Sequence, residues 1–164
     1  MNPCKCGYFG HPTRACTCTP SAIERYRHRV SGPLLDRIDL HVEVGPVQYD
    51  ELAGSQQAEC SADIRKRVIA ARAVQSARYA GEGIRCNSEL SGRLLPRSCQ
   101  PDAAPAALLQ AAFDRLGLSA RAYDRILKVS RTIADLAGCE QIGAVHLAEA
   151  LQYRSLDRKY WYDK

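Results

Sequence analysis

Residues 1–18 read MNPCKCGYFGHPTRACTC and place four cysteines in two Cys-x-Cys pairs. The nine residues between the pairs are rich in glycine and proline, which favours a tight loop over a helix or a strand. Such a loop would bring the two pairs together. Four thiolates give the closed tetrahedral coordination of a structural zinc site, with no position left for a substrate or water. The spacing therefore predicts a structural Zn²⁺ ion held by Cys4, Cys6, Cys16 and Cys18.

Two disulfides, or free redox-active thiols, are the alternatives for this cluster. The total of eight cysteines is even, as in a secreted disulfide-rich protein. Against disulfides, no apolar signal segment precedes the cluster, and 164 residues can form a core without covalent links. The remaining cysteines are scattered singly: Cys60, Cys86, Cys99 and Cys139. We therefore expect a reducing, cytoplasmic environment, and we find no segment that would span a membrane.

The charge balance is compatible with a polyanionic partner. The formal net charge is +5, with 46% hydrophobic and 25% charged residues, as in an ordinary globular protein. Two of the basic clusters are Arg25, Arg27 and Arg29, and Arg65, Lys66 and Arg67. The alternative is a solvated helix face, and a net charge of +5 is modest for a dedicated nucleic-acid binder.

Two periodic segments follow the cysteines. Thr19-Pro20 is a typical helix start, with a capping hydroxyl and a proline at the first helical position, and we expect a short helix from there to about Val30. After this helix, the spacing of the apolar residues changes from helical to strict alternation with polar residues. The alternating apolar residues predict a strand with one buried face, and they are Ile38, Leu40, Val42 and Val44.

Every periodic segment after about residue 57 is helical, so the fold class is expected to be mainly α. The predicted helices span Ser61–Ala80, Pro105–Leu116, Ser119–Ala137 and Ala144–Arg154. A loop rich in Gly, Ser and Pro is expected up to residue 102, and Gly117 and Gly138 are the expected stop signals between later helices. The inner stripe expected for the first of these helices is Ile64, Val68, Ala71 and Val74.

Four stretches of the chain closely resemble the magnesium-chelatase-like AAA+ ATPases of the ComM/YifB type. They are residues 1–7 (MNPCKCG), 31–40 (SGPLLDRIDL), 118–127 (LSARAYDRIL) and 131–136 (RTIADL). The likeness covers nearly the whole chain. It implies an ATP-driven hexameric motor on DNA, made of identical subunits and linked to branch migration during natural transformation.

The resemblance also implies that these residues are the C-terminal portion of such an ATPase. A full-length member would carry a Lon-like domain and the Walker A and B motifs before this region, and no Gly-x₄-Gly-Lys-[Ser/Thr] occurs here. We therefore expect ATP and Mg²⁺ to be used only in the full-length ring, and this chain alone to be inactive. The implied division is the end of the αβ core with the cysteine loop and last core strand at 1–45, a linker at 46–58, a helical lid at 59–155 and a tail at 156–164.

The same resemblance implies roles for three residues. Asn2 corresponds to sensor 1, which orients the attacking water; alone, it would be an ordinary turn asparagine. Arg37 corresponds to the arginine finger that one subunit gives to its neighbour's ATP, with an ion pair to Asp36 or Asp39 as the alternative. Arg121 corresponds to sensor 2, which contacts the nucleotide of its own subunit, with a solvated surface arginine as the alternative.

Two further arginines, Arg125 and Arg131, share the expected helix of Arg121. We expect both to be surface or ring-contact residues. The terminal aromatic residues Tyr160, Trp161 and Tyr162 could stack bases, although such clusters more often pack on a helix or fray.

A second functional class stays open, that of a free-standing zinc-containing adaptor that binds nucleic acid or a partner without enzymatic activity. The basic clusters permit it. The expected strand argues against it, because a single strand needs neighbours that this chain does not offer. For the same reason we expect residues 1–45 to be poorly ordered in isolation, while the helical part folds by itself.

Overall fold

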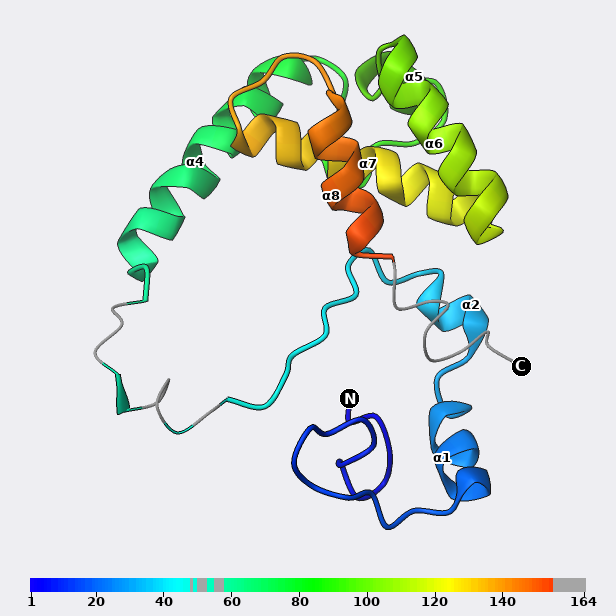
Figure 1. Cartoon of the computed structure of the whole chain (residues 1–164). Coiled ribbons are helices and arrows are strands. Elements are labelled where there is room, and N and C mark those ends of the chain that lie inside the picture. Colours follow the sequence, from blue (N-terminus) through cyan, green and yellow to red (C-terminus); the bar gives the residue numbers. More distant parts are fainter. Residues whose placement is uncertain (48, 50–52, 55–57, 155–164) are drawn as a thin grey trace. The chain divides into compact units, whose positions relative to one another are not determined.

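A computed structural model of the chain describes residues 1–47, 49, 53, 54 and 58–154 (Figure 1). These residues fall into two compact units, the first within Met1–Gly54 and the second within Ser55–Arg154. The expected tail at 156–164, with its aromatic cluster, and much of the expected linker lie outside the described residues. No described helix is long and apolar enough to cross a lipid bilayer.

The first unit consists of the cysteine loop, helix α1 (Pro20–Arg27) and the short helix α2 (Gly32–Leu35). The expected start of α1 is confirmed: the Thr19 hydroxyl accepts a hydrogen bond from the backbone N–H of Ala22 at 3.3 Å. Ser31 caps α2 in the same way, by accepting from Leu34 N–H. The described residues of the first unit include few buried apolar residues, namely Cys4, Ile23 and Leu35.

The expected strand at residues 38–44 is wrong. This segment has no regular secondary structure, and no strand occurs in the part of the chain that the structure describes. Its apolar side chains are 40% to 85% exposed, from Ile38 to Val44. The alternating pattern is suited to a sheet, but none of the described residues is in a strand, and an isolated strand is unstable in water.

The second unit is entirely helical apart from its connecting loops, as expected for a mainly α fold. Its elements are α4 (Ser61–Arg78), the 3₁₀ helix η1 (Asn87–Glu89), α5 (Leu94–Ser98), α6 (Ala103–Leu116), α7 (Ala120–Leu136) and α8 (Ala144–Gln152). The helices corresponding to α4, α6, α7 and α8 are confirmed within a few residues. The short elements η1 and α5 occupy a stretch that was expected to be a loop.

Glycines end two of these helices, as expected. Gly117 lies at the end of α6 with a φ of 60°, and Gly138 follows α7 with a φ of 68°. Backbone in this left-handed region is costly for residues that carry a Cβ, so glycine terminates a helix there with little strain.

Helix α7 is central to the second unit. It packs against α8, α4, α5 and η1, while α6 packs against α8 (Figure 1). The buried core includes Leu90, Leu109, Ile126, Leu127, Ile142 and Leu147. The packing therefore joins α7 to elements that precede and follow it in the chain, and α7 also carries Arg121.

The expected inner stripe of α4 is largely wrong. Only Ala71 of the four residues is buried, whereas Ile64, Val68 and Val74 are 44% to 47% exposed. Gln75 is buried instead. The reason is visible in Figure 1, where the N-terminal half of α4 extends away from α7 and α8, so that only its C-terminal half is covered.

Candidate functional site

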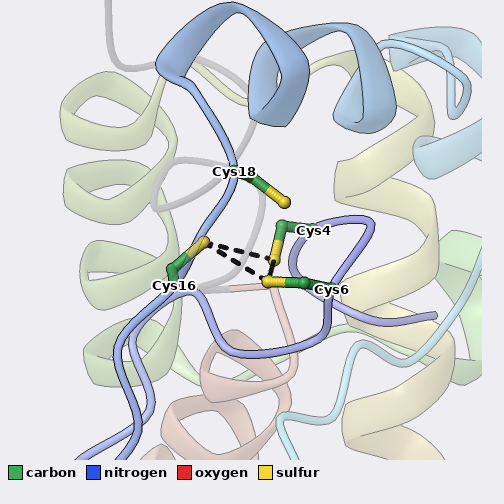
Figure 2. Close-up of side chains that lie close together, drawn as sticks. All are labelled: Cys4, Cys6, Cys16 and Cys18. Carbon is green, nitrogen blue, oxygen red and sulfur yellow. Dashed lines mark hydrogen bonds between the residues drawn. The ribbon is translucent and has the colours of Figure 1, made fainter.

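The four N-terminal cysteines converge on one point. The Cys4 sulfur lies 3.3 Å from that of Cys6 and 3.7 Å from that of Cys16, and the Cys6 and Cys16 sulfurs are 3.5 Å apart. Cys18 points toward the other three from the segment that leads into α1 (Figure 2), and all four sulfurs lie within 4.8 Å of one another.

These spacings suit a tetrahedral metal ion. With a Zn–S distance of about 2.3 Å, an ideal tetrahedron has S···S edges of about 3.8 Å. The three closest sulfur pairs are within half an ångström of that value. The cysteine cluster could therefore hold a metal ion, and its all-sulfur donor set is compatible with structural zinc.

Two glycines shape the loop that connects the cysteine pairs. Gly7 has a φ of 86° and Gly10 a φ of 78°, both in the region that favours glycine. The Gly7 N–H donates to the Cys4 carbonyl at 3.1 Å, which closes a turn around the first pair. A second turn follows, where His11 N–H donates to the Tyr8 carbonyl at 3.1 Å. The glycine-rich loop expected from the sequence thus returns the chain to the second pair.

The loop backbone stabilises negative charge on sulfur. Backbone N–H groups of Tyr8 and Thr17 donate to Cys6 and lower its pKa to about 5. The backbone N–H of Cys18 lowers the pKa of Cys16, but burial and the neighbouring Cys6 sulfur outweigh it and raise that pKa to about 12. A first thiolate therefore forms readily and disfavours a second beside it. A bound cation would remove that mutual repulsion and allow several sulfurs to ionise together.

Arg27 connects helix α1 to the cysteine loop. Its Nε donates to the Pro3 carbonyl at 3.5 Å, and its guanidinium carbon lies 4.6 Å from the centre of the Phe9 ring. Arg14 lies within the loop and donates to the Tyr8 hydroxyl at 2.8 Å. These contacts make the loop and α1 a single small structure.

Asn2 and Arg37 both lie in the first unit and both are exposed. The Asn2 side chain lies beside Gly7. A Cβ atom added to Gly7 would be 3.7 Å from the side-chain amide nitrogen of Asn2. Arg37 lies just beyond Asp36, the C-cap of α2, and donates to the Pro33 carbonyl at 3.4 Å. Within the described residues, no hydrogen bond or ion pair joins Asn2 to Arg37. The two side chains are therefore exposed without a direct contact of this kind between them.

Arg121 is the second residue of α7 and is exposed. The Ser119 hydroxyl caps this end of the helix by accepting from Ala122 N–H at 3.1 Å, and Ala122 itself is buried. A cation in the first helical turn is disfavoured by the helix dipole, by roughly 0.3 to 1 kcal/mol, unless an anion lies nearby. Arg121 is thus on a rigid element in a position suited to an anionic ligand.

A buried polar network around Asp135 was not anticipated from the sequence. Its carboxylate accepts two hydrogen bonds from Arg78, at 3.0 and 2.5 Å, one from Arg131 Nε at 3.0 Å and one from Asn87 at 2.8 Å. Tyr79 in turn donates to the Asn87 side-chain oxygen at 2.6 Å. Burial raises the pKa of Asp135, but the hydrogen bonds from Arg78 and Asn87 and the charge of Arg131 outweigh it, so the pKa is lowered.

The expectation that Arg131 is a surface residue is wrong. It is only 3% exposed, and its other guanidinium nitrogens donate to the carbonyls of Cys139 and Glu140, each at 2.6 Å. One signal could have indicated this. Arg131 and Asp135 form an i, i+4 pair within the stripe of α7 that also contains Leu127 and Ala134, so both charges fall on the buried face.

A cavity of about 610 Å³ opens beside this network in the second unit. Its charged lining residues are Arg78, Arg97, Arg131, Glu82, Asp102 and Glu140. Arg97 pairs with Glu82 at 3.0 Å, and Arg78 and Arg131 are engaged by Asp135. Because the opposite charges balance, the cavity offers no excess charge to an ionic ligand.

Both units match known protein families. The family model described as magnesium chelatase, subunit ChlI, matches residues 1–52, and the model described as magnesium chelatase, subunit ChlI C-terminal, matches residues 58–154. The first match contains the cysteine cluster and Arg37, and the second contains Arg121.

Similar proteins occur in several bacteria. Competence protein ComM of Haemophilus influenzae is 44% identical over 160 residues, which cover 96% of this chain and 30% of that protein. The uncharacterized protein YifB of Salmonella typhimurium is 40% identical over 161 residues, with the same coverage. The uncharacterized protein Rv2897c of Mycobacterium tuberculosis is 37% identical over 153 residues, covering 93% of this chain and 30% of that protein. The chain therefore spans about 30% of the length of these curated relatives.

Proposed function

The chain belongs to the magnesium chelatase subunit ChlI family, and on this premise we propose that it is the C-terminal part of a hexameric, ATP-dependent motor that acts on DNA. The observation that carries the proposal is the order of the two family matches, which follow one another along the chain and cover nearly all of it. A similar protein named for competence favours a role in the recombination of incoming DNA during natural transformation.

In this proposal, the first unit is the end of the AAA+ core up to about residue 45, and residues 46–58 connect it to a helical lid at 59–155. The nucleotide-binding motifs would be supplied by the rest of the full-length protein. ATP and Mg²⁺ would accordingly be bound only in the assembled ring of identical subunits.

We assign Arg37 the role of an arginine finger on the ATP of the neighbouring subunit. It is exposed and lies just beyond the C-cap of α2, a helix that Ser31 caps and Leu35 anchors by burial. A permanently charged, planar guanidinium can stabilise the charge that spreads over the γ-phosphate oxygens in the transition state. Asn2, also exposed, would help to orient the attacking water.

Arg121 would contact the nucleotide held by its own subunit, as sensor 2. Its exposed side chain at the N-terminal end of α7 supports this assignment, because an anionic phosphate would offset the unfavourable dipole there. Movement of the lid would then change the position of Arg121 and couple nucleotide state to lid angle.

We further propose that Cys4, Cys6, Cys16 and Cys18 hold one structural Zn²⁺ ion. The sulfur spacings and the backbone N–H donors to Cys6 support this. The closed sulfur set leaves no open position for catalysis, so the ion would hold the loop and, through it, the segment near Arg37.

The ATPase rate of the full-length protein tests the proposal. Arg37→Ala should reduce the DNA-stimulated rate by roughly 10³-fold, and Arg37→Lys should not restore it, because an ammonium lacks the planar fork of donors. Arg115→Ala, at an exposed position in the last turn of α6, is the matched control and should keep the wild-type rate. A full-rate Arg37→Ala enzyme would reject the finger, and a full-length protein that hydrolyses no ATP with DNA would reject the motor.

A further inference from the structure

The basic cluster at Arg25, Arg27 and Arg29 and the one at Arg65, Lys66 and Arg67 differ in how their charge is compensated. In residues 1–30, five cations stand against one carboxylate, Glu24, which leaves a net charge of +4. The Oε1 atom of Glu24 lies 3.7 Å from Nε2 of His28. Neither Arg25 nor Arg29 forms an ion pair with any residue in the described part of the chain. Four thiolates with one Zn²⁺ would still leave this segment at a net charge of +2.

The second cluster, on α4, is largely neutralised by its neighbours. Lys66 pairs with Asp63 at 2.8 Å, and Arg67 pairs with Glu59. The two clusters look alike in sequence, yet two of the three cations on α4 are paired, whereas Arg25 and Arg29 form no ion pair within the described residues.

Aromatic rings accompany the unpaired cations. Arg29 lies 5.7 Å from the centre of the Tyr26 ring, and Arg14 lies 5.3 Å from that of Tyr8. Phe9 has Arg27 over one face and remains 39% exposed. Single-stranded nucleic acid is bound by this combination, in which cations follow the phosphates and rings stack with the bases.

We propose that the cysteine loop and α1 form a binding surface for single-stranded DNA, which we call the loop–α1 surface and define as Lys5, Phe9, Arg14, Arg25, Tyr26 and Arg29. The four cations contact backbone phosphates, and Phe9 and Tyr26 stack with bases. The contact between Arg27, Pro3 and Phe9 fixes α1 against the loop, so the charges and rings are presented together. This rests on the proposed function and names where the motor contacts its DNA.

The first test measures binding of the zinc-loaded 164-residue chain to a fluorescent oligothymidylate by anisotropy. Removing two cations with Arg25→Ala and Arg29→Ala should weaken binding about tenfold near 0.1 M salt and reduce the slope of log K against log [salt] by about 1.4. Lys66→Ala with Arg67→Ala removes the same formal charge from α4 and should change affinity less than about twofold. Equal losses in both double variants would show that only net charge matters and would overturn the proposal.

The second test addresses stacking. Phe9→Leu keeps the apolar bulk beneath Arg27 but removes the aromatic face, and it should weaken binding about fivefold or more while zinc content stays at one ion per chain. Unchanged affinity in this variant, or equal affinity for a duplex of matched length, would overturn the stacking surface. Binding to oligouridylate without binding to oligothymidylate would assign the surface to RNA and overturn the assignment to DNA.

These outcomes are separable from those of the motor. If the full-length protein shows DNA-stimulated ATPase activity while the Arg25→Ala and Arg29→Ala double variant binds single strands as well as the wild type, the loop–α1 surface is rejected and the motor stands. If the chain binds single strands as described but the full-length protein hydrolyses no ATP, the motor is rejected and the surface stands.

Discussion

Each of the two units of this chain has its own kind of internal stabilisation. The described residues of the first unit bury few apolar side chains and bring four cysteine sulfurs within 4.8 Å of one another. The second buries a continuous apolar core around α7 and adds a polar network at Asp135. The difference shows that helical packing can stabilise one part of a chain, while a neighbouring part with few buried apolar side chains would, under our proposal, be stabilised by a metal site.

Loss of a cysteine ligand should give the largest difference between the two units in the effect of a substitution. Cys16→Ser should abolish zinc binding and unfold the loop, since the binding energy of structural zinc, about 10 to 16 kcal/mol in zinc-finger peptides, is also folding energy. The helical unit should keep its thermal transition, measured by circular dichroism. Cys60→Ser, at an exposed cysteine that is not part of the four-cysteine cluster, is the control and should retain one ion per chain. Unchanged zinc content in Cys16→Ser would rule out the four-cysteine site.

Removal of Asp135 should do the reverse: it should destabilise the helical unit and leave zinc binding unchanged. Asp135→Ala leaves Arg78 and Arg131 without their shared partner, and breaking such a buried pair costs about 3 to 5 kcal/mol. Urea unfolding of the helical unit should show this loss while zinc content is unchanged. Asp124→Ala, at an exposed position on the same helix, should change the free energy of unfolding by less than about 0.5 kcal/mol. Equal effects of the two variants would argue against a structural role for the network.

A core truncation should act on the helical unit alone, with a somewhat smaller effect. Leu147 is fully buried on α8, so Leu147→Ala should cost about 2 to 5 kcal/mol of that unit's stability. Val145 lies two residues earlier and is 73% exposed, and Val145→Ala is the matched control with an effect near zero. A comparable loss in Val145→Ala, or a loss of zinc in Leu147→Ala, would contradict the independence of the two units.

Acid should weaken the helical unit through Asp135. Because the pKa of Asp135 is lower in the folded state, its ionised form contributes stability above the unfolded value, about pH 4. That contribution is lost as the pH falls through the folded value. The free energy of unfolding should therefore decline on acidification, and more steeply in the wild type than in Asp135→Asn. Identical pH profiles for the two proteins would show that this carboxylate is not the titrating group.

The smallest expected effects come from the two helix caps. Ser119→Ala should cost about 1 kcal/mol of the helical unit's stability. Thr19→Ala should leave that unit unchanged and weaken zinc binding about fivefold instead, because about 1 kcal/mol of folding energy is then subtracted from metal binding. Zinc titration and urea unfolding of each variant distinguish these outcomes. An effect of Thr19→Ala on the helical unit would show that the units are coupled.

Much of the helical structure in both units could be predicted from local signals. Thr19 and Ser119 cap helices where a hydroxyl precedes an apolar period, and Gly117 and Gly138 end them. The convergence of the cysteines was also predictable, because the glycines of the loop permit the turns that return the chain. These features depend on residues close together in sequence.

The features that escaped prediction depend on distant partners. A strand at 38–44 requires a neighbouring strand, which alternation alone does not supply. The covered part of α4 is decided by its packing against α7, and not by its own apolar stripe. Asp135 and Arg78 are 57 positions apart, so their pairing is not visible in either local pattern.

In the proposed ring, Arg37 of the first unit contacts the ATP of the neighbouring subunit, while Arg121 of the helical unit contacts the ATP of its own subunit. Full-length Arg37→Ala and Arg121→Ala subunits, each inactive alone, can be co-expressed in equal amounts with two tags and recovered as mixed rings. About a quarter of the interfaces would then join an intact Arg37 to an intact Arg121. The predicted result is an ATPase rate of about a quarter of the wild type. Mixed rings that remain inactive would contradict the claim, because every site would lack one arginine if both served the same subunit.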